Sequence, residues 1–203
     1  MPKPDLASDP TPTRVRLLHA AEEEFGLAGF AGARLADISA RAGIRRSSLL
    51  YHFSSKDLLY TAVVERTLAD IAEAILPTLR SGGSTRERIM APVQRFAGFL
   101  ETRPSAARIL LREILDDRGP GREIVVKQGV PLIALVETFL QREGSEYIPA
   151  GYPLRALLMQ AVSNLLLWAV AGRLREPLWG GHHNAPELVG ALWNMQPEPT
   201  GAH

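Results

Sequence analysis

A short run of polar and basic side chains carries the most specific chemistry in this sequence. Residues 45–48 read Arg-Arg-Ser-Ser, and Tyr51 and His52 follow about one helical turn later. A guanidinium group donates paired hydrogen bonds to the O6/N7 edge of guanine, and hydroxyl and basic groups bond to phosphate oxygens. These residue types are therefore suited to contacting the bases and phosphates of duplex DNA.

Two short helices joined by a tight turn are expected to position these side chains. Leu35 and Ile38 lie one turn apart in the first helix, which gives it a narrow apolar face for packing on a neighbour. Gly43 supplies the permissive backbone that a sharp turn between helices needs. The polar residues then begin the second helix, which is the part that enters the major groove in helix-turn-helix proteins.

Basic charge is concentrated in this segment rather than spread along the chain. The whole chain has a formal net charge of +1, which argues against a general polyanion binder. Between Phe30 and Lys56 there are five basic residues and one acid, Asp37, so the segment carries a net charge of about +4. The basic residues are Arg34, Arg41, Arg45, Arg46 and Lys56.

Composition narrows the other kinds of chemistry. The chain has no cysteine, which removes disulfides, thiolate metal sites and cysteine nucleophiles. No apolar run occurs in residues 1–12, so we expect a cytoplasmic protein. The apolar segment Leu154–Ala171 contains Arg155 and Gln160, which favours a buried or dimer-forming helix over a membrane span. We expect no metal and no cofactor, because the pair His182-His183 has no carboxylate nearby.

Helical spacing dominates the chain, and no sustained strand pattern occurs. We therefore expect an all-α fold of about nine helices. Residues 1–12 are expected to form a disordered arm, residues 13–56 a three-helix helix-turn-helix domain, and residues 57–203 a larger helical bundle for ligand binding and dimerisation. Thr13 is expected to cap the first helix, and Pro131 to kink a helix that spans residues 122–142.

The order of these motifs resembles the TetR family of bacterial transcriptional regulators. The resemblance implies a ligand-responsive DNA-binding regulator that is not an enzyme. It further implies a repressor that binds a pseudo-palindromic operator as a homodimer and is released by a small apolar effector. Beyond Leu59 only the number and order of helices agree. The matching motifs are Gly29-Phe30, Leu35–Ile38, Ala42-Gly43-Ile44, Leu50–Phe53 and Ser55–Leu59.

The resemblance also implies a set of DNA contacts. Arg45 and Arg46 are adjacent and project about 100° apart on a helix, so we expect Arg46 to read a base and Arg45 to contact a phosphate. Two positions depart from the family pattern: Leu50 replaces a common aromatic residue, and Arg34 replaces a Thr that caps the second helix. The expected DNA contacts are Arg34, Arg45, Arg46, Ser47, Ser48, Leu50, Tyr51, His52 and Lys56.

The larger helical part offers residues for an effector and for a second copy. Polar residues in the apolar helix after Pro153 either orient a ligand or bond within the core or across a dimer. The expected effector contacts are Phe96, Phe99, Arg112, Gln160, Asn164 and Trp168. The expected dimer interface, which alternatively packs inside its own subunit, is Leu154, Leu158, Val162, Leu165, Ala169 and Leu192.

Two other classes of function stay open at this point, namely a helical enzyme and a protein-interaction module with no DNA role. The acidic clusters Glu22–Glu24 and Asp116-Asp117 are interpreted as solvated faces, because adjacent carboxylates diverge on a helix. The sequence contains no nucleophile-elbow, zinc-protease or phosphate-loop motif. The clustered Arg residues of the turn motif argue against a purely protein-binding module.

Overall fold

The computed structural model describes residues 12–116, 119–144, 153–180 and 185–192, which are largely helical and contain no strand. The all-α expectation is confirmed. The expected arm, the pair His182-His183 and the C-terminal residues lie outside the described ranges. The helices of seven residues or more are α1 (Thr13–Gly32), α2 (Leu35–Arg41), α3 (Arg46–His52), α4 (Lys56–Ile75), α5 (Thr85–Thr102), α6 (Pro104–Leu115), α8 (Val130–Glu143), α9 (Leu154–Val170) and α11 (Ala185–Leu192).

Short elements complete the described chain. They are η1 (Leu76–Arg80), α7 (Arg122–Ile124), the π-helical turn η2 (Val125–Gly129), η3 (Gly172–Leu174) and α10 (Arg175–Trp179).

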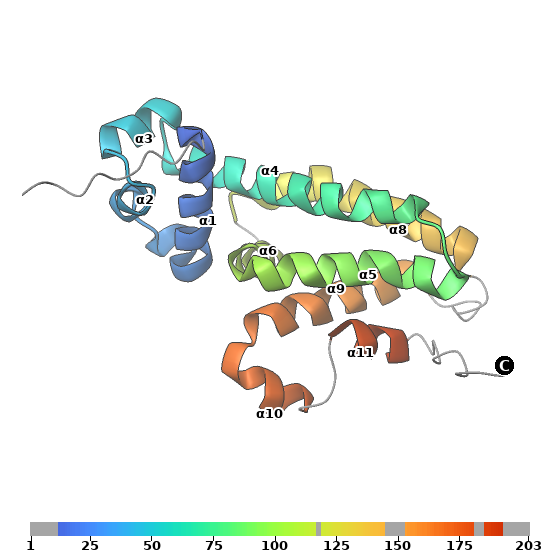
Figure 1. The fold of residues 1–203 in the computed structure, drawn as a ribbon. Helices are drawn as coiled ribbons and strands as arrows, with labels where there is room; N and C mark the ends of the chain where they lie inside the picture. The colour runs from blue at the N-terminus through green and yellow to red at the C-terminus, as the bar shows by residue number, and fades with distance from the viewer. Residues whose placement is uncertain (1–11, 117–118, 145–152, 181–184, 193–203) are drawn as a thin grey trace, which may run out of the picture.

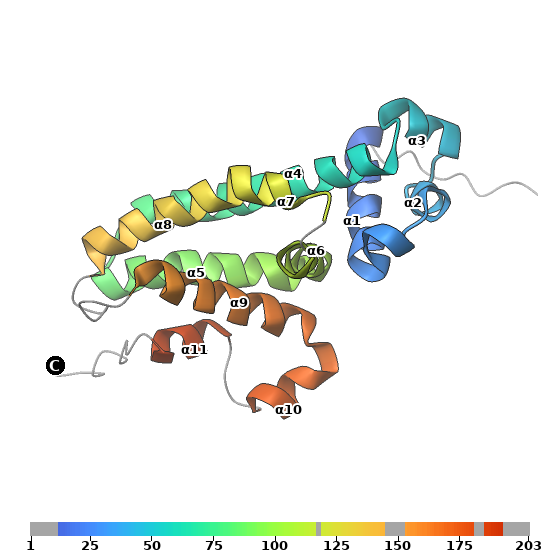
Figure 2. The ribbon, with the colours of Figure 1, turned by 180° about the vertical axis from the view of Figure 1, so that it is seen from behind.

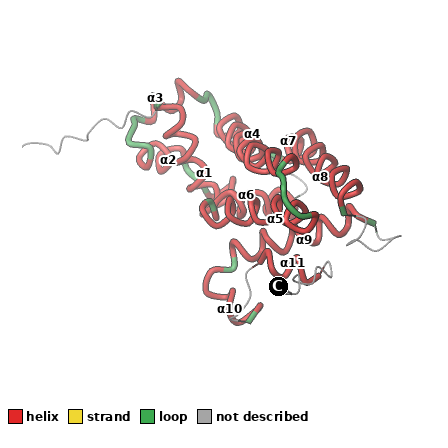
Figure 3. The backbone as a smooth tube through the Cα atoms, turned by 45° about the vertical axis from the view of Figure 1, so that its right-hand side comes forward, coloured by secondary structure: helices red, strands yellow, loops and turns green. Residues whose placement is uncertain are grey.

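The molecule has a small head at one end of an elongated helical body. Figure 1 shows α1, α2 and α3 grouped at that end, and α4 running from them along the body beside α8. Figure 2 shows α5 and α9 on the other side of the body, with α10 and α11 beyond α9. In the tube of Figure 3 the loops are short segments between helices. We call α1–α3 the head and the described chain from α4 onward the body.

Local sequence signals explain where α4 and α5 begin. The hydroxyl of Ser55 accepts a hydrogen bond from the Leu58 N–H at 3.2 Å and caps α4. Serine is one of the residues preferred at this position of a helix. Ser84 and Glu87 form a capping box at the start of α5. Thr13, in contrast, is not a cap: α1 begins at Thr13 itself, after Pro12, and has no side-chain cap.

The helix expected over residues 122–142 is present as three contiguous helical segments, α7, η2 and α8. The π-helical turn η2 follows the single turn α7, and Pro131 lies in the first turn of α8. Proline is tolerated there because the first N–H groups of a helix have no partner inside it. The expected kink at Pro131 is therefore replaced by a π-turn just before it, a feature that often marks functional sites.

In the described chain, none of the helices alone has the length and apolar character needed to cross a membrane. Helix α9 and the following Gly172–Trp179 segment together have this length and apolar character, but the two segments are bent by 113° from each other.

Head and body share one continuous core. Helix α1 makes its most extensive packing against α6 of the body. The two helices approach so closely at Gly26 that a Cβ atom there would lie 2.6 Å from the Cβ of Ser105. Gly26 is thus required by a close approach rather than by a helix end, and α1 continues past it to Gly32, with a break at Gly29 where φ is 72°.

A buried ion-pair network also joins the two parts. Arg103, at the start of α6, bonds to Glu22 of α1 through Nε at 3.1 Å and also pairs with Asp70 of α4. The Glu22 side chain is 7% exposed. The interpretation of Glu22 as part of a solvated face is therefore wrong. The sequence did not indicate the pairing, because Arg103 lies 81 residues further along the chain.

Candidate nucleic-acid interface and effector cavity

The turn between α2 and α3 fixes the position of α3. Ile38 on α2 and Leu49 on α3 are fully buried in the core. Gly43 adopts a φ of 66° in the turn, and the Ile44 N–H donates to the Ser39 carbonyl at 3.0 Å. Because the apolar side of α3 is anchored in this way, its opposite side is held toward solvent.

That outer side of α3 carries the residues that the sequence singled out. Arg46, Ser47, Ser48, Tyr51 and His52 are all exposed. Tyr51 is 87% exposed, with its ring 5.6 Å from the His52 ring. Aromatic side chains of this size are usually at least partly buried, so the exposed Tyr51 ring does not serve to pack the head.

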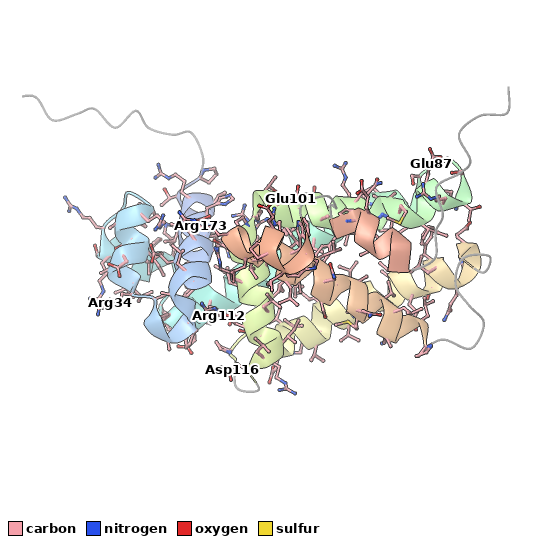
Figure 4. All side chains as sticks on the ribbon, turned by 90° about the horizontal axis from the view of Figure 1, so that it is seen from below. Arg34, Glu87, Glu101, Arg112, Asp116 and Arg173 are labelled. Carbon is pink, nitrogen blue, oxygen red and sulfur yellow. The ribbon has the colours of Figure 1, made fainter. Side chains whose placement is uncertain are left out.

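Arg45 and Leu50 differ from the expected geometry in detail. Arg45 is the residue before α3, in an extended backbone conformation, so the 100° argument for a helical pair does not apply to it. Leu50 is 39% exposed and lies on the flank of the outer face. Arg34 precedes α2 without capping it through its side chain, as the substitution of the family's Thr predicts. Figure 4 shows Arg34 at the end of the head that faces away from the body.

A shallow groove on the head adds residues that the sequence did not indicate. It is lined by Thr13, Ile44, Ser47, Ser48, Tyr51 and His52. Thr13 was interpreted only as a cap. The neighbouring Arg14 is exposed, and its guanidinium carbon lies 5.3 Å from the centre of the Phe53 ring. The Thr-Arg pair at the start of α1 was visible in the sequence, but its proximity to α3 was not.

The basic residues of the head fall into two groups. Arg41 is paired with Glu24 of α1 at 2.6 Å. Arg34, Arg45 and Arg46, in contrast, form no ion pair with any described residue. These three guanidinium groups therefore keep their hydrogen-bond donors for a ligand.

Lys56 is already committed inside the protein. Its ammonium group donates to the carbonyl of Ala33 at 2.9 Å and to that of Ala31 at 3.3 Å, and lies 4.7 Å from the centre of the Phe30 ring. Lys56 thus closes the end of α1 and joins it to the start of α4. A phosphate contact by Lys56 stays a prediction, and it would have to share this group with the α1 carbonyls.

A hydrogen bond in the buried interior connects α4 to α6 near the head. The Tyr60 hydroxyl donates to Glu113 Oε1 at 2.5 Å, and the Tyr60 ring packs edge-on against Phe25, with centroids 4.8 Å apart. Burial, and then the bond to Glu113, raises the pKa of Tyr60 well above its usual value. Tyr60 therefore stays protonated and links the head to α6 through α4.

The body contains a cavity of about 130 Å³ between its helices. Helix α4 contributes Ile71 and Ile75, and the π-turn η2 contributes Gly129. The remaining lining residues come from α5, α8 and α9: Ile89, Pro92, Val93, Phe96, Leu132, Ile133, Val136, Leu140, Leu158, Ala161, Val162 and Leu165.

The expected effector contacts are dispersed, and only Phe96 lines this cavity. Phe99 lies in a separate outer groove with Arg95 and Thr102. Arg112 reaches back to the Leu27 carbonyl at 3.4 Å, and Figure 4 shows it where α6 meets the head.

The other three expected contacts lie elsewhere on α9. Gln160 is exposed, and Trp168 packs edge-on against Trp179 at 5.7 Å. Asn164 has a buried Oδ1 that accepts no hydrogen bond from any described residue. Direct effector contact by any of the six stays a prediction.

The expected dimer stripe faces inward along most of its length. Leu158, Val162 and Leu165 line the cavity, and Ala169 is 8% exposed. Leu154 is partly buried, and the side chain of Leu192 lies outside the description. The stripe therefore packs inside its own subunit, and its part in a dimer stays a prediction. Large exposed apolar side chains near the end of α9 are Leu167, Leu174 and Leu178.

Comparison with known proteins gives consistent matches for the head and the fold. Residues 17–63 match the model of the family described as bacterial regulatory proteins, tetR family. The chain is 35% identical over 97 residues to the HTH-type transcriptional activator FasR of Mycolicibacterium smegmatis, covering 48% of this chain and 44% of that protein. It is 33% identical over 69 residues to the HTH-type transcriptional repressor SCO4008 of Streptomyces coelicolor, covering 34% of this chain and 36% of that protein.

The likeness at the level of structure extends further. A crystal structure of a TetR-like transcriptional regulator from Rhodococcus sp. RHA1 superposes with a TM-score of 0.68 at 22% identity, covering 89% of this chain and 93% of that chain. This similarity concerns the fold, whereas the matched sequence spans less than half of the length of either relative. The matched family and relatives are regulators of transcription rather than enzymes.

Proposed function

We propose that this chain is a member of the TetR family of bacterial transcriptional regulators, whose family model matches residues 17–63, and that it binds an operator in duplex DNA as a homodimer and releases it when a small apolar effector enters the body. Such a protein meets its DNA in the cytoplasm. The proposal assigns operator binding to residues 13–56 and effector binding and dimerisation to residues 57–203.

The exposed outer face of α3 is the observation that carries the proposal. It presents Arg46 and Tyr51 to solvent without partners of opposite charge, while the inner face is locked in the core. A guanidinium fork fits the guanine edge in the major groove and discriminates by about 1–3 kcal/mol. Ser47 and Ser48 supply hydroxyls for phosphate or base contacts at the same helix start.

One such head reads few base pairs, so two copies are needed for a specific site. A symmetric dimer places its recognition helices on half-sites one helical repeat apart, and the operator then mirrors the protein's two-fold axis. Because most of the expected stripe is buried within one chain, we propose that a partner copy instead packs on the exposed apolar residues near the end of α9, which are Leu167, Leu174 and Leu178.

Helix α4 provides a mechanical route from cavity to operator. Its C-terminal half lines the cavity with Ile71 and Ile75, and its N-terminal half holds the head through Lys56 and Tyr60. A displacement of α4 by an effector would change the distance between the two heads of a dimer. The effector releases DNA only if it binds the DNA-incompetent arrangement more tightly.

We propose repression as the sign of regulation, following the default of the family. Of the two relatives, FasR is an activator and SCO4008 is a repressor, so the sign of regulation needs its own measurement. Expression of a reporter under the bound promoter should rise when the gene for this protein is deleted. A fall on deletion would make the protein an activator.

The test of DNA binding is a titration against fragments flanking the protein's own gene, at several salt concentrations, with random DNA in parallel. One palindrome-bearing fragment should bind tightly, with a salt slope that reports several phosphates per dimer. The double variant Arg46→Ala, Tyr51→Ala should lose at least about tenfold in affinity and still dimerise. Arg142→Ala, an exposed Arg on α8 far from the head, is the matched control. Equal loss in both variants, or equal affinity for random DNA on every fragment, would contradict the proposal.

A further inference from the structure

The walls of the body cavity offer an occupant no hydrogen bond from a side chain. Its fifteen lining residues are aliphatic apart from Phe96, Pro92 and Gly129. A hydroxyl, amide or charged group buried among them would lose its bonds to water without replacement. Walls of this kind favour a hydrocarbon occupant over a polar one.

The residues that line the cavity are spread along three helices of the body. They extend along the helices over Ile89–Phe96 of α5, Leu132–Leu140 of α8 and Leu158–Leu165 of α9. At 1.5 Å per residue these stretches each measure about 10–12 Å. A volume of about 130 Å³ drawn out over such a length leaves the width of a single chain.

We infer that the cavity holds one unbranched aliphatic chain of the effector by apolar contact alone, and that the polar end of the effector lies outside it. This inference rests on the proposed function for its regulatory consequence, but not for the binding itself. It names the chemical class of ligand: any molecule whose slender hydrocarbon tail can enter, whatever its head group.

The position of the chain explains how the tail would act on the head. The tail would lie against Ile71 and Ile75 of α4 on one side and against Gly129 of η2 and the α8 residues on the other. Ile71 is eleven residues from Tyr60, or about 16 Å along one continuous helix. A longer tail would separate α4 from α8 more than a shorter one, and it would displace the helix that holds the head.

The experiment measures binding of n-butanol, n-hexanol, n-octanol and n-decanol to the full chain. Binding is detected by calorimetry or by the shift in melting temperature. Each added methylene transferred into the cavity should tighten binding by about fourfold, which corresponds to ~0.8 kcal/mol per methylene. The gain should stop once the chain is as long as the cavity. Affinity that does not depend on chain length would overturn the inference.

Two variants on the same helix separate binding in the cavity from a general effect of alcohols on the protein. Ala161→Leu adds a side chain inside the cavity, whereas Ala156→Leu makes the same change on the exposed side of α9. We expect Ala161→Leu to abolish the chain-length series and Ala156→Leu to keep it. The same response in both variants would place the alcohols elsewhere and overturn the inference.

The head group is tested with n-octanoate and n-octylammonium beside n-octanol. If the polar end lies outside the cavity, the three ligands should bind within about tenfold of one another, because none of the charged groups is buried. A loss of several hundredfold for either charged ligand would mean that the head enters the apolar walls, contrary to the inference.

Failure of this inference is distinguishable from failure of the proposed function. The alcohol series needs no DNA, and the operator titration needs no alcohol. Specific operator binding without the dependence on chain length would support the proposed regulator and contradict the aliphatic site. Dependence on chain length without specific DNA binding would support the aliphatic site and contradict the proposed regulator. If n-octanol releases operator fragments from the starting protein but not from Ala161→Leu, the aliphatic site regulates DNA binding.

Discussion

The head and the body place their candidate sites in opposite environments. The head leaves an aromatic ring and unpaired charges in solvent. Tyr51 is 87% exposed, and Arg34, Arg45 and Arg46 form no ion pair with the described chain. The body hides its site inside the core and lines it with ordinary aliphatic residues. A site for a charged polymer must leave its donors in solvent, whereas a site for a hydrocarbon must exclude water.

This difference matters because the two sites share one scaffold. Helix α4 holds the head through Lys56 and Tyr60 and also forms a wall of the cavity. The Arg103 network and the close α1–α6 packing then fasten the head to the body. The comparison therefore predicts two chemically different sites in one cooperative unit rather than in two independent domains.

The largest expected effect comes from Arg103→Ala. This change leaves Glu22, 7% exposed, as a buried carboxylate without its partner, and removes one of the two ion-pair partners of Asp70, which keeps Arg66. Breaking a buried pair by removing one member costs about 3 kcal/mol or more. We expect the urea midpoint to fall with a single transition followed by both Trp fluorescence and far-UV dichroism.

Arg142→Ala on the exposed end of α8 should leave the midpoint within about 0.5 kcal/mol of the starting protein. Two separated transitions in Arg103→Ala, one of them matching a head that unfolds alone, would break the comparison by showing that the head is an independent domain.

A smaller effect is expected from glycine substitutions that test the packing between head and body. A Cβ at Gly26 would lie 2.6 Å from the Ser105 Cβ and 2.7 Å from its Cα, so Gly26→Ala forces α1 away from α6. Overpacking of this kind costs about 1–3 kcal/mol. Gly98→Ala lies in α5 with open space around the new methyl group and should stabilise by about 1 kcal/mol. Thermal melts of the two variants should shift in opposite directions, and a rise for both would show that α1 and α6 separate freely.

The contrast between the two sites also explains what the sequence reveals. The recognition helix was predictable because its polar residues, Gly43 and the buried Leu49 follow one another within a single local motif. The cavity was not, because Ile71 and Val136 have the same helical spacing as core residues and differ only in having empty space beside them. Polar residues such as Gln160 were predicted to contact the effector instead, and Gln160 is exposed.

Contacts between distant segments were hidden for a related reason. Glu22 stands in a run of three acids that indicates a solvated face, and its Arg103 partner is separated from it by most of the head and α4 and α5. Lys56 was assigned to a phosphate from its type and place, while its bonds to the Ala31 and Ala33 carbonyls follow only from how α1 ends. Local motifs specified the head's outer face, and long-range packing determined how the head is fastened.

The smallest expected effect concerns His19, which lies beside that fastening on α1. Its Nε2 is 2.9 Å from Arg66 Nη2, and because the guanidinium can only donate, the ring must accept and be neutral. Partial burial, and then the charge of Arg66, lowers the pKa of His19 below its ordinary value of 6.5. A lowered pKa means that the folded state binds fewer protons than the unfolded state near that pH. His19 therefore contributes stability above about pH 6.5, and this contribution is lost as the pH falls through the folded-state pKa.

Replacing His19 with Gln keeps an acceptor for Arg66 and removes the titration. Between about pH 7.5 and about pH 5.5, the melting temperature of His19→Gln should fall less than that of the starting protein. Operator affinity at the higher pH should be unchanged, because His19 points to the body side of α1 through Arg66 rather than to the α3 face. An identical pH slope in both proteins would mean that the Arg66 contact is too weak to shift the ring's titration, and the fastening of α1 to α4 would then rest on Arg103 and the close packing at Gly26.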